Sequence, residues 1–307
     1  MNRLQRVLRV LAGLCCMLLP VACTGFQGNP GEPGAVVLDI GHCIGAEGAK
    51  TPGPVNGKYL TETAFWYQYA VYTKRVIERA GYRCTICNRG YMPRTEPLRS
   101  YARRAGVIHL RRPDLEGHRR ASRYFKDRVA SGIISADYAV WRRASCMVFL
   151  HHNSSSSRWK DGSSPSVVLH NRYNGAPLAR AVAARMESDI LNHGMPNGGV
   201  GCRTAARYVD ASRGAGWLNA CDDAGIPAAV LEVAFLHNRA HAAYLANEAN
   251  ARRYAEAVGR GIVDYLRRSG QDRRHYRRDL NRADEGSFGY ARESRRADVP
   301  GAKRLIR

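Results

Sequence analysis

Residues 35–40 of the chain read AVVLDI, a short and almost entirely apolar run that ends at Gly41. A run of this length and composition is typical of a strand that is buried on both faces of a parallel sheet. From Glu62 to Ala80 the apolar residues recur at helical spacing, which predicts an amphipathic helix that ends at Gly81. Residues 82–87 then predict a second strand. Strand, helix and strand together make a βαβ unit, the repeating element of α/β proteins.

The rest of the chain continues this pattern. Further strands are expected at residues 146–150, 166–170 and 228–233, and further helices at 178–191 and 254–266. Residues 154–165 and 194–201 are polar or glycine-rich and predict loops. The sequence therefore predicts an α/β fold with an open, twisted, mostly parallel sheet that is flanked by helices on both faces.

Composition excludes several protein classes. The chain has 307 residues, of which 45% are hydrophobic and 24% charged, an ordinary globular mixture that excludes collagen-like, low-complexity and wholly disordered proteins. No apolar run reaches the roughly 18 residues that a membrane-spanning helix needs, which excludes a polytopic membrane protein. The 48 Lys and Arg residues exceed the 26 Asp and Glu residues, so the formal charge is +22. Such a positive charge favours binding to anionic partners, but it does not indicate which one.

The N-terminus resembles an export signal. Three arginines precede the 13-residue apolar stretch from Val10 to Ala22, which is the length of a signal-peptide core. The small residues before Cys23 resemble a bacterial lipoprotein signal, which predicts membrane attachment through a lipidated Cys23; ordinary cleavage nearby is the alternative. We expect a signal peptide at residues 1–23, a glycine- and proline-rich tether at 24–33, and localisation in the periplasm or cell envelope.

The folded domain is expected at residues 34–268, with a basic insert at about 94–128 and a basic, disordered tail at 269–307. Six cysteines follow the signal, and an oxidising compartment favours disulfides; Cys202 and Cys221 are the preferred pair. Cys84 and Cys87 form a C-x-x-C motif inside an expected strand, with no second such motif, which favours a structural role for them.

Four polar residues lie at the ends of the expected strands or at the start of a helix. They are His42, Glu62, His151 and Glu232. In open α/β sheets, sites gather beyond the carboxyl ends of the strands. Two imidazoles and one carboxylate are a ligand set of catalytic zinc, and a second carboxylate nearby serves as a general base. Glu232 also lies among apolar residues, where an unpaired carboxylate is costly to bury.

These residues carry a resemblance to the zinc-dependent N-acetylmuramoyl-L-alanine amidases of the amidase 3 family, which covers about residues 34–268. That family opens with a strand and a D-P-G-H-G turn, and this chain has DIGHC at residues 39–43. A glutamate at the next helix start is matched by TETAF at 61–65, and an S-I-H-A-N strand end by FLHHN at 149–153. Near the end, L-V-E-x-G-F-x-S-N is matched by VLEVAFLHN at 230–238.

The resemblance implies a phosphorylase/hydrolase-like fold and a zinc ion held by His42, Glu62 and His151. Glu232 would take the proton of the attacking water and pass it to the departing amine. The implied substrate is peptidoglycan, cut between N-acetylmuramic acid and L-alanine. Together with the N-terminal signal, this predicts an exported enzyme, and we expect a monomer that binds no nucleic acid.

Some positions depart from the family pattern or compete for a role. Ile40 replaces Pro, Cys43 replaces Gly and Ala234 replaces Gly. Cys43 could bind the metal itself, Glu47 is a rival to Glu62 as the carboxylate ligand, and His152 could exchange roles with His151.

Two other functions remain open from the sequence. One is a non-catalytic peptidoglycan-binding lipoprotein that kept the fold and lost the metal. The other is a zinc peptidase that cuts stem peptides rather than the bond between sugar and peptide.

Overall fold

The structure is a computed structural model that describes residues 35–42, 47–89, 93, 95–110, 133–154, 157–160, 166–195, 200–204 and 216–269. The strands are β1 (Val36–Ile40), β2 (Cys84–Arg89), β3 (Ile108–Leu110), β4 (Cys146–Leu150), β5 (Ser166–His170), β6 (Val200–Thr204) and β7 (Ala228–Glu232). The helices are α2 (Glu62–Arg79), α3 (Glu96–Ala105), α5 (Ile133–Trp141), α6 (Ala176–Asp189), α7 (Gly216–Asp223), α8 (Arg239–Ala246) and α9 (Glu248–Arg268), and η3 (Leu191–His193) is a short 3-10 helix.

The strands form one sheet in the order β3-β2-β1-β4-β7-β5-β6. Neighbouring strands are parallel except for β5 and β7, which are antiparallel. Ile40 pairs with Leu150 and Leu150 pairs with Leu231, so β1, β4 and β7 end at the same edge of the sheet. The predicted open, mostly parallel sheet is therefore confirmed. The residues that follow β1, β4 and β7 lie close together at this edge of the sheet.

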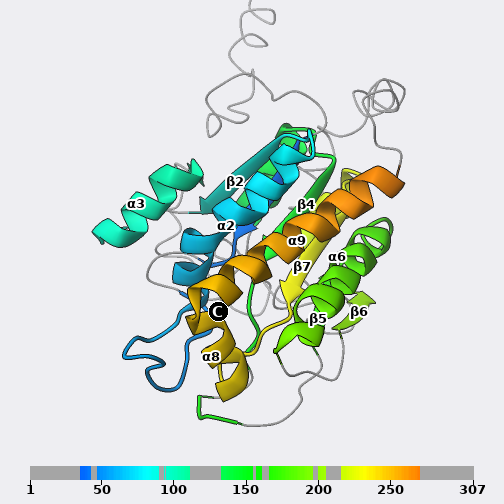
Figure 1. The fold of residues 1–307 in the computed structure, drawn as a ribbon. Coiled ribbons are helices and arrows are strands. Elements are labelled where there is room, and N and C mark those ends of the chain that lie inside the picture. Colours follow the sequence, from blue (N-terminus) through cyan, green and yellow to red (C-terminus); the bar gives the residue numbers. More distant parts are fainter. Residues whose placement is uncertain are drawn as a thin grey trace, which may run out of the picture.

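Helices cover both faces of the sheet, as predicted. Figure 1 shows α2, α9 and α6 side by side across one face, and α9 packs against both of the others. On the opposite face, α5 and α7 pack against each other and against β4 and β7. The alternation of side chains along a strand sends Leu38 and Val148 to the first layer and Val37 and Met147 to the second.

The helix that follows β1 starts where the sequence places it. The hydroxyl of Thr61 accepts a hydrogen bond from the backbone N–H of Ala64, at 3.3 Å, and caps the first turn. Glu62 is the first residue of the helix and is buried. This fixed start determines where the Glu62 side chain enters the fold.

Several described elements lie outside the predicted set. The expected basic insert at about 94–128 contains α3 and β3 in its described part, and α5, α7 and α8 are additional helices. The strand at residues 200–204 begins inside the loop predicted at 194–201. The apolar signal of α3 is weak because the residues that it buries are two alanines, Ala102 and Ala105, with Arg103 and Arg104 between them. The α5 sequence, IISADYAVW, is apolar on nearly every side and so lacks a helical pattern.

Of the two predictions about cysteines, the structural role of Cys84 and Cys87 agrees with the structure and the preferred disulfide does not. Cys84 and Cys87 are buried in β2 and belong to opposite core layers, so they cannot share a disulfide, which agrees with a structural role. Burial raises the pKa of both thiols, which makes them poor nucleophiles. The preferred Cys202–Cys221 bridge is wrong in this structure: Cys221 is a buried thiol that donates to the sulfur of Met147, at 4.0 Å.

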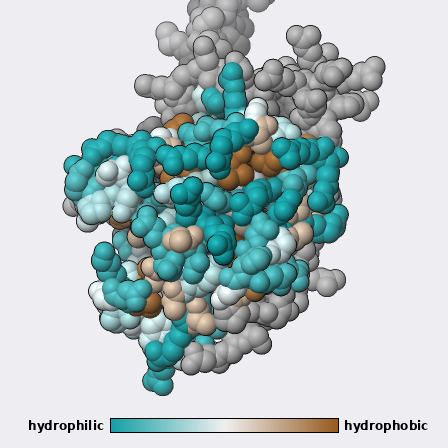
Figure 2. Space-filling model, in the orientation of Figure 1, coloured by the Kyte–Doolittle hydropathy of each residue, from teal (hydrophilic) through white to brown (hydrophobic). Residues whose placement is uncertain are grey.

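The outer face of the α2, α9 and α6 layer is mainly hydrophilic, with only small hydrophobic patches (Figure 2). Within the described part of the chain, no helix combines the length and the apolar character needed to cross a membrane. The expected signal peptide, Cys23 and tether lie outside the described residues, as does the expected tail from residue 270 onward.

The contact between α9 and α6 supplies a test of the packing. A Cβ added at Gly261 would lie 2.5 Å from the Cα of Val182, a backbone atom that cannot move aside. Alanine has a higher helix propensity than glycine by about 1 kcal/mol, but overpacking a core costs about 1–3 kcal/mol. We expect Gly261→Ala to lower the free energy of unfolding, measured in urea, whereas Arg267→Ala on the exposed side of α9 changes it little. Unchanged or higher stability of Gly261→Ala would contradict this account of the helix contact.

Candidate metal centre

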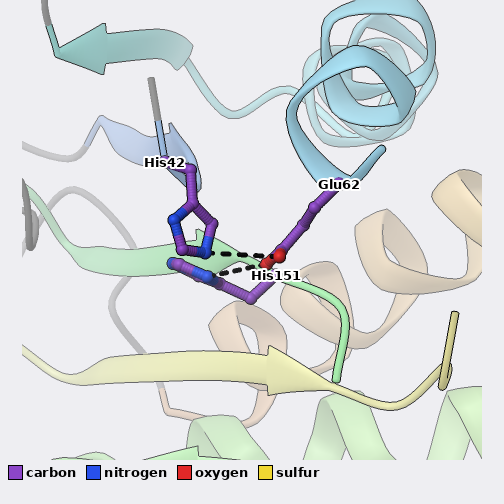
Figure 3. A group of neighbouring side chains, drawn as sticks. All are labelled: His42, Glu62 and His151. Carbon is purple, nitrogen blue, oxygen red and sulfur yellow. Dashed lines mark ion pairs between the residues drawn. The ribbon is translucent and has the colours of Figure 1, made fainter. Parts of the chain in front are cut away.

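Three side chains from separate parts of the chain meet at the carboxyl edge of the sheet. His42 follows β1, Glu62 opens α2, and His151 follows β4. Each offers one ligand atom, and these atoms all lie within 4.8 Å of one another. Figure 3 shows both imidazoles pointing at the carboxylate of Glu62.

Glu62 is the centre of this group. Its Oε2 lies 3.2 Å from Nε2 of His42, and its Oε1 lies 2.8 Å from Nδ1 of His151. Two backbone N–H groups also donate to it: that of Ala49 to Oε2 at 2.7 Å, and that of His152 to Oε1 at 2.8 Å. The side chain is therefore held in one orientation by two loops and two imidazoles.

The electrostatics keep Glu62 ionised. Burial alone would raise the pKa of this carboxyl, but the hydrogen bonds with His151 and His42 lower its pKa well below the usual range. Burial lowers the pKa of His151, against the opposing effect of Glu62. An anionic carboxylate and a neutral imidazole are the forms in which these side chains coordinate metals.

The group fits a divalent metal. Two imidazoles and one carboxylate are the protein ligands of one type of catalytic zinc site, which leaves a further coordination position open. The three residues come from distant positions, 42, 62 and 151, and two of them are buried. Buried titratable groups with strongly shifted pKa values are characteristic of functional sites.

Glu232 lies beside this group and outside it. It is the last residue of β7, and the pairing of Leu150 with Leu231 puts it next to His151 at the same edge of the sheet. Burial raises the pKa of the Glu232 carboxyl well above its usual value, and the negative charge of Glu62 adds to the effect. A carboxyl with a raised pKa beside a ligand group is suited to accepting and releasing a proton.

The structure separates the rival residues. Glu47 is exposed, and its backbone carbonyl accepts from Thr63 while its side chain lies outside the ligand group. The ring of His152 points into the layer of α2 and α9, where it stacks on Trp66 with ring centroids 5.3 Å apart. Burial lowers the pKa of His152 to about 3, so the ring is neutral. Cys43 lies outside the described residues.

One residue of the site is missed by reasoning from sequence. Gly48 has φ +73°, and a Cβ added there would lie 2.3 Å from Oε2 of Glu62 and 2.3 Å from Cδ2 of His42. The loop passes directly over the ligand group, and only a glycine fits. Residues 45–50 read GAEGAK, and a second glycine in this stretch gives no signal for this role.

Comparison with known proteins agrees with the geometry. The model of a family described as N-acetylmuramoyl-L-alanine amidase, Amidase_3, matches residues 36–264, which include all four residues above. No curated protein matches the chain.

Several solved structures are similar to the chain. The N-acetylmuramoyl-L-alanine amidase AmiC2 of Nostoc punctiforme is 17% identical, with a TM-score of 0.45 over 77% of this chain and 99% of that one. The catalytic domain of CwlV, an N-acetylmuramoyl-L-alanine amidase from Bacillus (Paenibacillus) polymyxa var. colistinus, is 19% identical, with a TM-score of 0.45 over 76% and 98%. The CwlD amidase from Clostridioides difficile, solved in complex with the GerS lipoprotein, is 16% identical, with a TM-score of 0.48 over 76% and 98%.

Proposed function

We propose that this chain, which belongs to the N-acetylmuramoyl-L-alanine amidase family Amidase_3, holds a catalytic zinc ion with His42, Glu62 and His151. As a member of this family, the chain is an enzyme that hydrolyses the amide bond between N-acetylmuramic acid and L-alanine in peptidoglycan. The observation that carries the zinc proposal is the convergence of two imidazoles and an ionised carboxylate within 4.8 Å.

The chemistry is demanding because an amide nitrogen donates into its carbonyl and is a poor leaving group. A zinc ion bound at this site would supply a Lewis acid, which polarises the scissile carbonyl and lowers the pKa of water. Glu62 contributes the single negative charge of the ligand set, and its two backbone donors, on Ala49 and His152, keep it in place.

Glu232 is proposed as the proton carrier. Its raised pKa means that the carboxylate holds a proton more firmly than a solvent-exposed glutamate does. It accepts a proton from the attacking water, whose oxygen stays on the carbonyl carbon, and delivers that proton to the nitrogen as the C–N bond breaks, so that L-alanine leaves as a neutral amine.

The place of action follows from the substrate. An enzyme that cuts peptidoglycan acts on the cell wall. Export by residues 1–23, lipidation of Cys23, a domain at residues 34–268 and a monomeric state stay proposals from the sequence. A lipidated Cys23 would hold the domain at the membrane surface, within reach of the wall through the tether at residues 24–33.

Digestion of purified sacculi tests the activity and the alternatives together. We expect wild-type protein to release intact stem peptides that begin with L-alanine, identified by mass spectrometry. Treatment with a chelator should abolish the release, and added zinc should restore it. Shortened stem peptides with the sugar bond intact would indicate the peptidase, and binding to sacculi without any product would indicate the non-catalytic protein.

Gly48 provides a prediction about the geometry of the ligand group. Gly48→Ala should weaken zinc binding by about 10-fold or more, the range seen when residues that orient ligands are changed, because the new Cβ collides with Glu62 and His42. Gly57→Ala is a matched control: Gly57 has φ +76°, so it carries the same backbone strain, but a Cβ there meets nothing within 4 Å. Equal zinc affinities of the two variants, measured by competition with a chromophoric chelator, would show that the loop over the site does not constrain it.

A further inference from the structure

We propose that Asn88 is a positioning residue that holds the backbone of His42, and so sets the affinity of the site for its metal. The inference rests on the proposed function, since it concerns the same ligand group. Asn88 lies in β2 and is fully buried. It is a polar residue at the carboxyl end of a strand, like the proposed ligands, but it contacts none of their side chains in the described structure.

His42 needs such support. Its φ is 62°, the left-handed region that non-glycine residues rarely adopt. It also lies beyond the end of β1, where the register with β2 covers only Val36 to Asp39. The carbonyls of Ile40 and His42 therefore receive no ladder hydrogen bond from β2, and an unpaired buried carbonyl is costly.

Asn88 supplies the missing donors. Its Nδ2 donates to the carbonyl oxygen of Ile40 at 2.6 Å and to that of His42 at 2.7 Å. One side-chain amide thus bridges the last residue of the strand and the proposed ligand. On the other side of the turn, the Thr63 hydroxyl donates to the carbonyl of Gly41 at 3.1 Å. Side chains therefore donate to three consecutive carbonyls, those of residues 40–42. Because Thr63 directly follows Glu62, the same contacts connect the turn that carries His42 with the start of α2.

The orientation of the Asn88 amide is also determined. Both neighbours of Nδ2 are carbonyl oxygens, which only accept, so the NH2 group must face them. The Tyr67 hydroxyl, which is fully buried in α2, donates to Oδ1 at 2.9 Å and fixes the opposite end. A carboxylate at this position would bring a negative oxygen against the two carbonyls, and alanine would leave both carbonyls without this donor.

The chain offers a matched control for this residue. Asn171 is equally buried, its Nδ2 donates to the carbonyl of Ile226 at 2.9 Å, and its Oδ1 accepts from the N–H of Ala228 at 2.9 Å. These contacts lie at the start of β7, at the opposite edge of the sheet from the ligand group. Removing Asn171 therefore breaks the same kind of buried hydrogen bonds away from the metal site.

The test compares zinc affinity with stability. The full chain is stripped with a chelator, and the dissociation constant for Zn²⁺ is measured by competition with a chromophoric chelator for wild type, Asn88→Ala and Asn171→Ala. Urea unfolding of the metal-free proteins gives the loss of stability of each. Cobalt-substituted proteins are compared by visible absorption, which reports the ligand geometry without any turnover.

We expect Asn88→Ala to weaken zinc binding by about 10-fold or more and to change the cobalt spectrum, as loss of an orienting partner does in other metal sites. Asn171→Ala should lose stability and keep the wild-type zinc affinity and spectrum. A folded Asn88→Ala protein with wild-type affinity would overturn the inference while leaving the proposed function intact. If Asn88→Ala does not fold, Tyr67→Phe is measured instead, because it removes only the hydroxyl that donates to Oδ1 of Asn88. Weaker zinc binding by this variant supports the inference, and unchanged binding overturns it. A wild-type chain that binds no zinc would remove the proposed function as well.

Discussion

Replacement of Glu232 by glutamine is expected to lower the rate of amide hydrolysis by about 10²–10⁴-fold, the usual contribution of a general acid–base group. Glutamine keeps the shape of the side chain but cannot accept and release a proton. Glu232 lies outside the group of ligand atoms formed by His42, Glu62 and His151, so the variant should take up zinc as wild type does. Loss of turnover with unchanged metal content is the expected combination.

The measurement is the release of stem peptide from sacculi, with zinc content determined on the same preparation. Glu47→Gln is the control, because Glu47 is the rival carboxylate, yet its side chain is exposed and lies outside the ligand group. That variant should work at the wild-type rate. A Glu232→Gln enzyme that keeps most of its activity would remove the residue from its proposed role.

Replacement of Glu62 by glutamine is expected to reduce zinc affinity by at least about 100-fold, and with it all detectable amide hydrolysis. Loss of a ligand should exceed the 10–100-fold cost of losing an orienting partner. The change removes the only negative charge of the ligand set. It also places an NH2 group among donors, because two backbone N–H groups and two imidazoles surround the carboxylate.

A competing interpretation of Glu62 is that it only stabilises the start of α2 through the helix dipole. Glu248 supplies the comparison, because it is the first residue of α9 as Glu62 is of α2. A first-turn acid of this kind is worth about 0.3–1 kcal/mol and no metal affinity. Glu248→Gln should therefore cost a little stability and leave zinc binding unchanged. If Glu62→Gln behaves in the same way, the helix-dipole interpretation is correct and the ligand proposal is wrong.

The sequence predicts the centre of the fold better than its edges. β1, β4 and β7 are short apolar runs because both faces of each are covered, and such runs are visible without a structure. The edge strands β3 and β6 pair on one side only; β3 has only three residues, and β6 contains Gly201 and Arg203. Their assignment depends on neighbours that are distant in the sequence.

The candidate site follows the same division. His42, Glu62 and His151 can be found because polar residues at strand and helix ends are few and fit a known ligand pattern. The role of Gly48 depends on how closely its loop approaches Glu62 and His42, and the role of Asn88 on how closely the turn after β1 approaches β2. Neither distance can be read from a single sequence. The prediction of a Cys202–Cys221 disulfide is wrong for a similar reason, because the contact between Cys221 and Met147 cannot be read from the sequence.

Zinc titration of the metal-free enzyme, followed by the rate of stem-peptide release, tests the central claim most directly. If His42, Glu62 and His151 hold one catalytic ion, activity should rise with each addition and stop rising at one zinc per chain, and the Glu62→Gln protein should stay inactive throughout. Full activity in a chain shown to contain no metal, or a titration that Glu62→Gln follows as closely as wild type, would contradict the claim.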